Sequence, residues 1–450
     1  MARSGRLVPG VLAACLWLAA PAVAGSRPDA DQACVPADAV QAPAPAGAGQ
    51  VPAAAGGAAP KAAPDQKPPS DEPIDVWDYL RKLRKKDAPA ASTEEQTRRL
   101  AVVIVPVVSS KPSSGFALGA GASLEQPLGD LRDTFVSSML ISFSISTKGF
   151  YTVALRPMVY GPANRWLLSG DNHFQKSGQE TYDLGTGASG ESLVEARYKS
   201  LKFVDTYYRQ VGQGVFAGAG LQYQRYSDIG PIDGEDAGWD ESAFVQYSRD
   251  AGFDLSAQTA AGLNVAVRRD SRDNVSDPGR GWFAEAILRA HMADFLGGTS
   301  TFQRLYLDAR TYRPITKDGQ QKLAFWTFAD IVTGGTAPYL SLPTNGADPM
   351  GRSARGYAEG RFRGDRLVYG EVEYRVPLRR DGLVGMVAFL NATTVGSTYA
   401  GESLFDSVAL GAGFGFRLRL QKRSRTNVCL DFGWGREGSR GVYIALAEAF

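Results

Sequence analysis

Polar and apolar residues alternate in short segments along most of the chain between residues 100 and 450. In residues 407–420 every even position is apolar, from Val408 to Leu420, whereas the odd positions hold small or charged residues. Successive side chains of a β-strand point to opposite faces, so this pattern predicts strands with one apolar face and one polar face.

Sixteen segments with this alternation are separated by breaks. They are residues 102–109, 115–126, 134–146, 149–160, 165–175, 196–209, 214–227, 255–269, 281–293, 302–315, 321–334, 366–378, 384–394, 407–420, 426–434 and 441–450. Their length and even number predict an all-β fold, a closed antiparallel transmembrane β-barrel of about 16 strands.

The breaks between the segments differ in length. Residues 161–164 and 379–382 are short, whereas residues 176–195, 228–254 and 335–365 are long. Short turns at one end of a barrel and long loops at the other are typical of outer-membrane proteins.

Charged residues alternate with apolar ones in several segments, for example in residues 304–310 and 371–376. A lipid-facing Arg or Lys at the bilayer midplane costs roughly 2–4 kcal/mol. We therefore expect the charged side chains to point into a polar lumen and the apolar ones to face lipid.

The N-terminus has the pattern of a secretory signal peptide at residues 1–24. Arg3 and Arg6 precede an apolar stretch, and a small-residue cleavage site ends before Gly25. Residues 12–15 also fit a lipoprotein cleavage box, which remains the alternative.

Residues 25–70 are rich in Ala and Pro and lack large apolar residues, so we expect a disordered periplasmic tether. Residues 71–99 are predicted to form a short amphipathic helix, Ile74 to Lys86, and a linker. This helix is expected to lie at the mouth of the barrel, with a plug or a docking site for a periplasmic partner as alternatives. Residues 100–450 form the predicted outer-membrane barrel.

The composition of the chain excludes several other classes of protein. The chain has 49 Lys and Arg against 47 Asp and Glu, and the signal peptide holds the two extra arginines, so no nucleic-acid partner is expected. Outside the signal peptide no stretch of 18 apolar residues occurs, which excludes a helical membrane protein. Cys34 and Cys429 are too few for a disulfide framework.

No catalytic, cofactor or metal site is predicted. The chain has two histidines, His173 and His291, and neither lies near a recognisable Ser or Cys nucleophile motif. We therefore expect a protein that is not an enzyme.

The segment from Gly351 to Pro377, GRSARGYAEGRFRGDRLVYGEVEYRVP, resembles the BamA-like barrels of the bacterial surface antigen family. That family includes outer-membrane protein insertases, TamA-type translocases and two-partner-secretion pores. Its mark is an Arg-Gly-aromatic motif on the sixth extracellular loop, followed by a strand with Glu. Here Arg355, Gly356 and Tyr357 match the motif, and Glu373 matches the strand.

The following strand of the family typically carries Phe-x-Asp-x-Gly. In this chain Phe389 is kept, but Asn391 replaces the acid and Thr393 replaces the glycine. The resemblance implies that the sixth loop folds into the lumen, where Arg355 pairs with Glu373 and Asn391 is a neutral acceptor. The alternative is an external loop whose arginines touch lipid phosphates, namely Arg352, Arg355, Arg361 and Arg363.

The resemblance also implies a weak seam between the first and last strands, which opens sideways in insertases. Pro106 lies in the first strand and cannot donate to the sheet. A frayed strand end is the alternative. The last strand is expected to present an outward apolar signal made of Val442, Ile444, Leu446 and Phe450. Glu448 falls on the same face, where we expect it to be tolerated near the interface.

The resemblance implies that the protein moves or inserts protein or lipid at the outer membrane. The Ala/Pro-rich segment cannot supply the family's polypeptide-transport-associated (POTRA) domains, so a member lacking them is expected. The expected partners are outer-membrane lipids, unfolded outer-membrane or secreted proteins, and a periplasmic protein bound through residues 74–86. A passive porin and a structural surface-antigen barrel are the alternatives.

Overall fold

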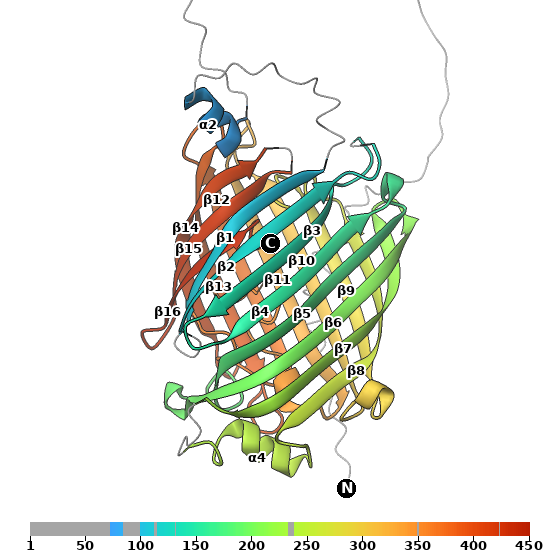
Figure 1. The fold of residues 1–450 in the computed structure, drawn as a ribbon, viewed down its shortest axis with the longest axis vertical. Helices are drawn as coiled ribbons and strands as arrows, with labels where there is room; N and C mark the ends of the chain where they lie inside the picture. Colours follow the sequence, from blue (N-terminus) through green and yellow to red (C-terminus); the bar gives the residue numbers. More distant parts are fainter. Residues whose placement is uncertain are drawn as a thin grey trace, which may run out of the picture. The chain divides into compact units, whose positions relative to one another are not determined.

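A computed structural model describes residues 73–83, 100–111, 115–130, 132–232, 238–348, 351–422 and 424–450. The predicted signal peptide and the predicted disordered tether lie outside the described residues. Sixteen antiparallel strands form one sheet, in which each strand pairs with its neighbours in sequence (Figure 1). No helix within the described ranges is long and apolar enough to cross a membrane.

Each of the sixteen predicted segments coincides with one strand, which confirms the predicted strand count. The strands are β1 (Ala101–Lys111), β2 (Gly115–Gln126), β3 (Ser137–Ser146), β4 (Tyr151–Tyr160), β5 (Trp166–Thr181), β6 (Val194–Gly212), β7 (Val215–Pro231), β8 (Ala257–Asp270), β9 (Gly281–His291), β10 (Phe302–Pro314), β11 (Lys322–Gly335), β12 (Arg366–Pro377), β13 (Val384–Gly396), β14 (Ala409–Gln421), β15 (Thr426–Trp434) and β16 (Arg440–Leu446). The helices are α2 (Val76–Leu83) and α4 (Ala243–Asp250), with short 3₁₀ helices at Pro162–Asn164, Gly190–Ser192, Phe295–Gly297 and Tyr339–Ser341.

The two faces of the sheet differ as the alternation predicts. In β12, Tyr369, Glu371 and Glu373 are buried, and the residues between them are more exposed. In β14, Leu410 and Phe416 are exposed on the opposite face, which is the one we assign to lipid. The polar side chains therefore line the interior.

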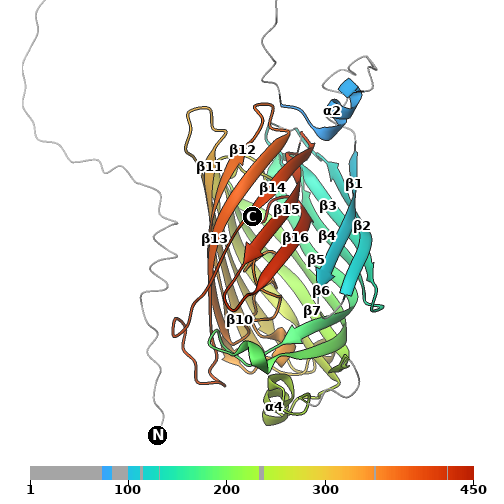
Figure 2. The ribbon, with the colours of Figure 1, turned by 90° about the vertical axis from the view of Figure 1, so that its left-hand side faces the viewer.

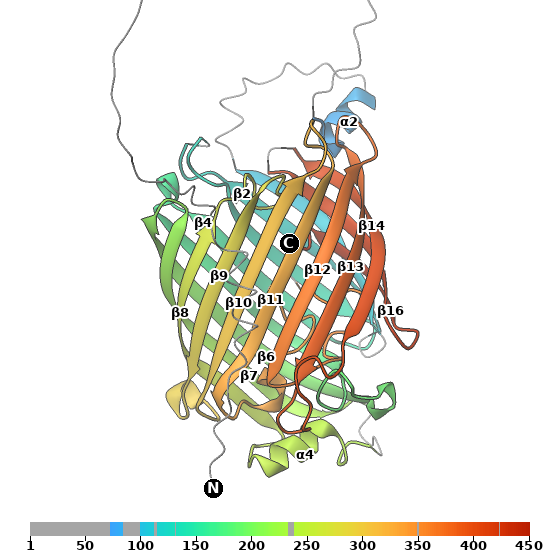
Figure 3. The ribbon, with the colours of Figure 1, turned by 180° about the vertical axis from the view of Figure 1, so that it is seen from behind.

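The longest connections between strands all lie at one end of the sheet. The chain enters β1 and leaves β16 at the same end, which we call the turn end; α2 lies there, and α4 lies at the opposite, loop end (Figures 1 and 3). The loop end carries the long connections, including residues 232–256 and loop 6, which we define as residues 336–365. This division agrees with the short and long breaks in the sequence.

The sheet is not closed by hydrogen bonds, which corrects the predicted closed barrel. Strands β1 and β16 lie near each other (Figure 2), but in the described part of the chain no ladder joins them. One reason is length, because β16 has 7 residues and β1 has 11. Another is Pro106, which pairs with Ala120 of β2 but has no N–H to offer a second strand.

The end of the chain turns into the lumen, which corrects part of the predicted outward signal. Val442 and Ile444 are exposed on the outer face as expected, but Phe450 is only 3% exposed. The chain turns after β16 at Ala447, where φ is +64°. Beyond this turn, Arg375 Nη2 donates to the main-chain oxygen of Phe450 at 2.9 Å.

Glu448 is also inside the barrel and not at the lipid interface. Arg417 Nε donates to Glu448 Oε2 at 2.7 Å, and Asn427 Nδ2 donates to Glu448 Oε1 at 2.7 Å. A buried carboxylate must be paired, and the lumen supplies the partners that the bilayer lacks.

Candidate functional site: the luminal latch

Arg355 of loop 6 is completely buried among carboxylates from two strands. Its Nη1 atom donates to Asp431 Oδ2 of β15 at 2.7 Å. Its Nη2 atom donates to Glu373 Oε2 of β12 at 2.5 Å and also to Glu371. The guanidinium carbon lies 3.7 Å from the centroid of the Phe389 ring, so the cation also contacts an aromatic face.

The charges around Arg355 balance within the lumen. Arg375 Nε donates to Glu373 at 2.7 Å, Arg417 Nη1 donates to Asp431 at 2.5 Å, and Arg352 Nη1 lies 3.7 Å from Asp431. The cluster contains four arginines and four carboxylates, which are Arg352, Arg355, Arg375, Arg417, Glu371, Glu373, Asp431 and Glu448. Pairing of this kind allows so many buried charges to be tolerated.

Glycines in the wall allow the backbone of loop 6 to approach it closely. Gly356 has φ of +113°, and a Cβ atom there would lie 2.8 Å from the backbone of Trp434. A Cβ atom at Gly433 would lie 2.7 Å from the Gly356 nitrogen, and one at Gly411 would lie 2.8 Å from the Arg355 carbonyl oxygen. The glycine-rich strands β14 and β15 are thus shaped to receive this loop.

We expect Gly356→Ala to loosen loop 6, because the new methyl group meets backbone atoms and the backbone conformation disfavours side chains. Strain of this kind costs about 1–3 kcal/mol. The measurement is the free energy of unfolding of the barrel in detergent or vesicles. Gly370→Ala in β12 is the matched control, since nothing lies within 4 Å of its added Cβ atom. Equal stability of the two variants would contradict this steric account.

The Tyr357 hydroxyl connects β14 to the chain that follows β15. The ladder between these strands begins at Ala412 and Trp434. Beyond it, the Tyr357 hydroxyl donates to the Leu410 carbonyl oxygen at 2.5 Å and accepts from the Arg436 backbone N–H at 2.9 Å. A loop side chain therefore replaces ladder hydrogen bonds where the two strands separate.

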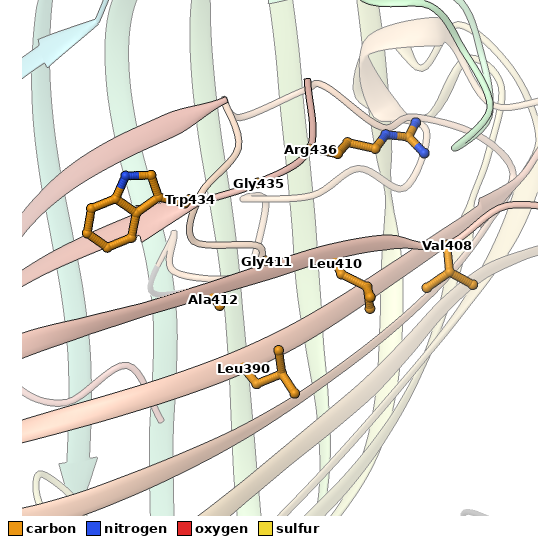
Figure 4. Close-up of a pocket in the computed structure, with 8 residues that line it drawn as sticks. All are labelled: Leu390, Val408, Leu410, Gly411, Ala412, Trp434, Gly435 and Arg436. Carbon is orange, nitrogen blue, oxygen red and sulfur yellow. The ribbon is translucent and has the colours of Figure 1, made fainter. Parts of the chain in front are cut away.

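A shallow depression marks the same place on the wall. Leu390, Leu410 and Trp434 line it together with Arg436 (Figure 4). Its volume is about 390 Å³. The depression lies where β15 ends and Tyr357 completes the contact between strands.

Tyr443 brings the last strand into the site. Its hydroxyl accepts from the Gly356 backbone N–H at 2.8 Å and donates to the Tyr357 carbonyl oxygen at 3.2 Å. We call Arg355, Gly356 and Tyr357 with these contacts the luminal latch. It touches β12, β13, β14, β15 and β16.

Asn391 has a different role from the expected one. Its Nδ2 atom donates to the carbonyl oxygen of Arg355 at 3.0 Å, so it does not accept from the guanidinium. The acid that β13 lacks comes from Asp431 of β15, which sequence reasoning missed. The available signal was the alternation of Asp431 with the apolar Leu430 and Phe432, which places Asp431 on the inner face.

The other arginines of loop 6 are buried as well, so none is placed to reach lipid phosphates as the alternative required. Arg361 Nη2 lies 3.2 Å from Glu437, and Arg363 Nη1 donates to the Tyr339 carbonyl oxygen at 3.1 Å. Arg352 is 4% exposed. Loop 6 therefore folds inward along its described length.

A second charged cluster lies toward the turn end of the lumen. The connection between β8 and β9, residues 271–280, carries Asp277 to strands on another part of the sheet. Asp277 accepts from Lys322 Nζ at 2.5 Å and from Arg419 Nη2 at 2.9 Å, and it lies 3.6 Å from Arg375. Because Arg375 also pairs with Glu373, charged contacts run from the luminal latch to the turn end.

This combination of a sixteen-stranded antiparallel sheet, an apolar outer face and a long loop tucked into a charged lumen defines an outer-membrane-type β-barrel. Residues 215–435 match the Omp85 superfamily domain. The matched segment spans β7 to β15 and loop 6, and Omp85 superfamily barrels sit in the bacterial outer membrane.

Solved structures with a similar fold include BamA from Haemophilus ducreyi lacking POTRA domains 1–3. It aligns with a TM-score of 0.50 and 15% identity over 77% of this chain and 69% of that chain. CdiB from Acinetobacter baumannii aligns with a TM-score of 0.48 and 11% identity over 78% of this chain and 66% of that chain. No curated protein sequence matches the chain.

Proposed function

We propose that this protein is a gated outer-membrane barrel that moves or inserts protein or lipid, and that loop 6 is its luminal gate. The observation that supports this is the reach of the luminal latch. Arg355 bonds to β12 and β15, and the two residues after it bond to Tyr443 of β16. Release of the latch would therefore unblock the lumen and free the last strand together.

The edges of the sheet suggest a route for the client. Because β1 and β16 are not joined by a ladder, their separation breaks few hydrogen bonds compared with any other strand pair. We propose that the seam between them opens toward the membrane. The turn end, where α2 lies, then faces the periplasm. No catalytic group or cofactor is required for this role.

Single-channel conductance in planar bilayers tests the gate. We expect small, flickering currents from the wild-type barrel and large, steady currents after deletion of residues 341–364, because the deletion removes the luminal latch. Shortening the turn at residues 316–320 is the control, since it leaves the latch intact and is expected to leave conductance unchanged.

The same recordings separate the rival functions. Large, steady wild-type currents would contradict the gate and favour a passive porin. Absence of current in every variant, together with an unaltered envelope after gene deletion, would favour a structural barrel without transport.

A reducible disulfide engineered between β1 and β16 tests the seam. In cells depleted of the native protein, the oxidised variant is expected to lose function and to regain it on reduction. Measuring outer-membrane protein levels and lipid composition in the same cells distinguishes a protein client from a lipid client. Full function of the oxidised variant would exclude opening at the seam.

A further inference from the structure

Helix α2 packs on the outer wall of the barrel. Val76 contacts a small apolar cluster with Leu420 of β14, Val428 of β15 and Leu446 of β16. Leu420 continues the series of outward residues in β14 that includes Leu418, but it is covered to 9% exposure. The helix therefore lies outside the lumen and is not a plug. This holds for Val76–Leu83, the described part of the helix predicted at Ile74 to Lys86.

Polar contacts to the turns of the barrel also hold the helix in this position. The Ile74 backbone N–H donates to the Asp381 carbonyl oxygen at 3.2 Å, between β12 and β13. Lys422, after β14, donates from its backbone N–H to Asp75 Oδ2 at 3.3 Å and from Nζ to Asp78 Oδ2 at 2.8 Å. These turns lie at the edge of the apolar outer face.

The rest of the apolar side of α2 is uncovered. Trp77 is 51% exposed, Leu80 is 38% exposed and Leu83 is 64% exposed. At 3.6 residues per turn they spread on both sides of Val76, whereas Asp78 lies on the opposite side of the helix. The uncovered side chains therefore extend the apolar outer face of β14–β16.

We propose that α2 is an interfacial helix whose exposed apolar side chains, Trp77, Leu80 and Leu83, insert into the membrane leaflet at the turn end. Lipid is the occupant that fits, because the surface continues the lipid-facing wall, where Leu418 and Ile444 are exposed. Trp is enriched at the membrane interface. Arg81, whose side chain is 58% exposed beside its ion pair with Asp78, provides positive charge for lipid phosphates.

Because α2 packs against the end of β16, its contact with lipid also affects the position of this last strand. Val76 packs in the cluster that contains Leu446, the last residue of β16, next to the seam. An inserted α2 therefore fixes the depth of β14–β16 in the membrane beside the seam.

The test places an environment-sensitive fluorophore on single cysteines in the full-length mature protein, folded into vesicles of phosphatidylethanolamine and phosphatidylglycerol. Cys34 and Cys429 are replaced by alanine. The labelled variants are Trp77→Cys and Leu83→Cys. The references are Leu418→Cys on the lipid-facing wall and Asp318→Cys in an exposed turn at the same end of the sheet.

We expect lipids with a shallow nitroxide to quench the labels at residues 77 and 83 at least twofold more than the label at residue 318. Iodide in the aqueous phase should quench residue 318 and spare the other three positions. If residues 77 and 83 respond like residue 318, the proposal is overturned. Protection of these labels only when a soluble periplasmic extract is added would overturn it too, in favour of a protein partner.

Discussion

Arg355→Ala is expected to release loop 6 from the lumen and to destabilise the barrel by about 3–5 kcal/mol. The substitution leaves Glu371 and Glu373 next to each other with less compensating charge, and removal of one member of a buried ion pair has a cost of this size. Both carboxylates and the guanidinium are completely shielded from solvent, so water cannot replace the lost bonds. Urea unfolding in vesicles measures the stability.

Trypsin treatment of intact cells measures release of the loop in the same variant. Loop 6 contains buried arginines, so cleavage within residues 352–363 is expected in Arg355→Ala and not in the wild type. Arg249→Ala in α4 is the control, because Arg249 pairs with Asp240 on the surface, where ion pairs contribute roughly 0–1 kcal/mol. Unchanged protease resistance in Arg355→Ala would show that other contacts hold the loop and that the latch is wrongly assigned.

Asp277→Asn is expected to destabilise the turn end by about 3 kcal/mol or more. An amide offers one acceptor to Lys322 or to Arg419 and presents N–H groups to the other cation, so a buried positive charge loses its partner. Urea unfolding is again the measurement. Asp318→Asn is the matched control, since Asp318 lies in an exposed turn between β10 and β11 and makes its hydrogen bonds within that turn.

The difference between the wild type and Asp277→Asn is expected to depend on pH. Burial alone would raise the pKa of Asp277, but Lys322, Arg375 and Arg419 outweigh it and lower the pKa to about 2. In the unfolded chain the pKa of this Asp is about 3.9. The carboxylate therefore stabilises the fold fully above about pH 4, and this contribution is lost as pH falls toward 2. A difference that stays constant between pH 5 and pH 2 would contradict the ion-pair account.

Much of the fold follows from the sequence because a transmembrane strand faces two different media. Lipid selects apolar residues at alternate positions of a strand, and the lumen selects polar residues at the positions between them. The number and approximate positions of the strands are therefore visible in the local sequence, although β5 continues to Thr181, beyond its predicted end at residue 175. The same alternation placed Glu373 on the inner face. The Arg-Gly-Tyr motif identified the part of loop 6 that meets it.

Only the tertiary structure decided which groups meet. Asp431 reaches Arg355 from 76 positions away in the chain, and no local pattern distinguishes its role from that of Asn391. The inward turn at Ala447 reverses the side on which Glu448 and Phe450 lie, because alternation predicts orientation only while a strand continues. Closure of the sheet likewise depends on whether two distant edges pair, and that is determined by the assembled barrel and not by either strand alone.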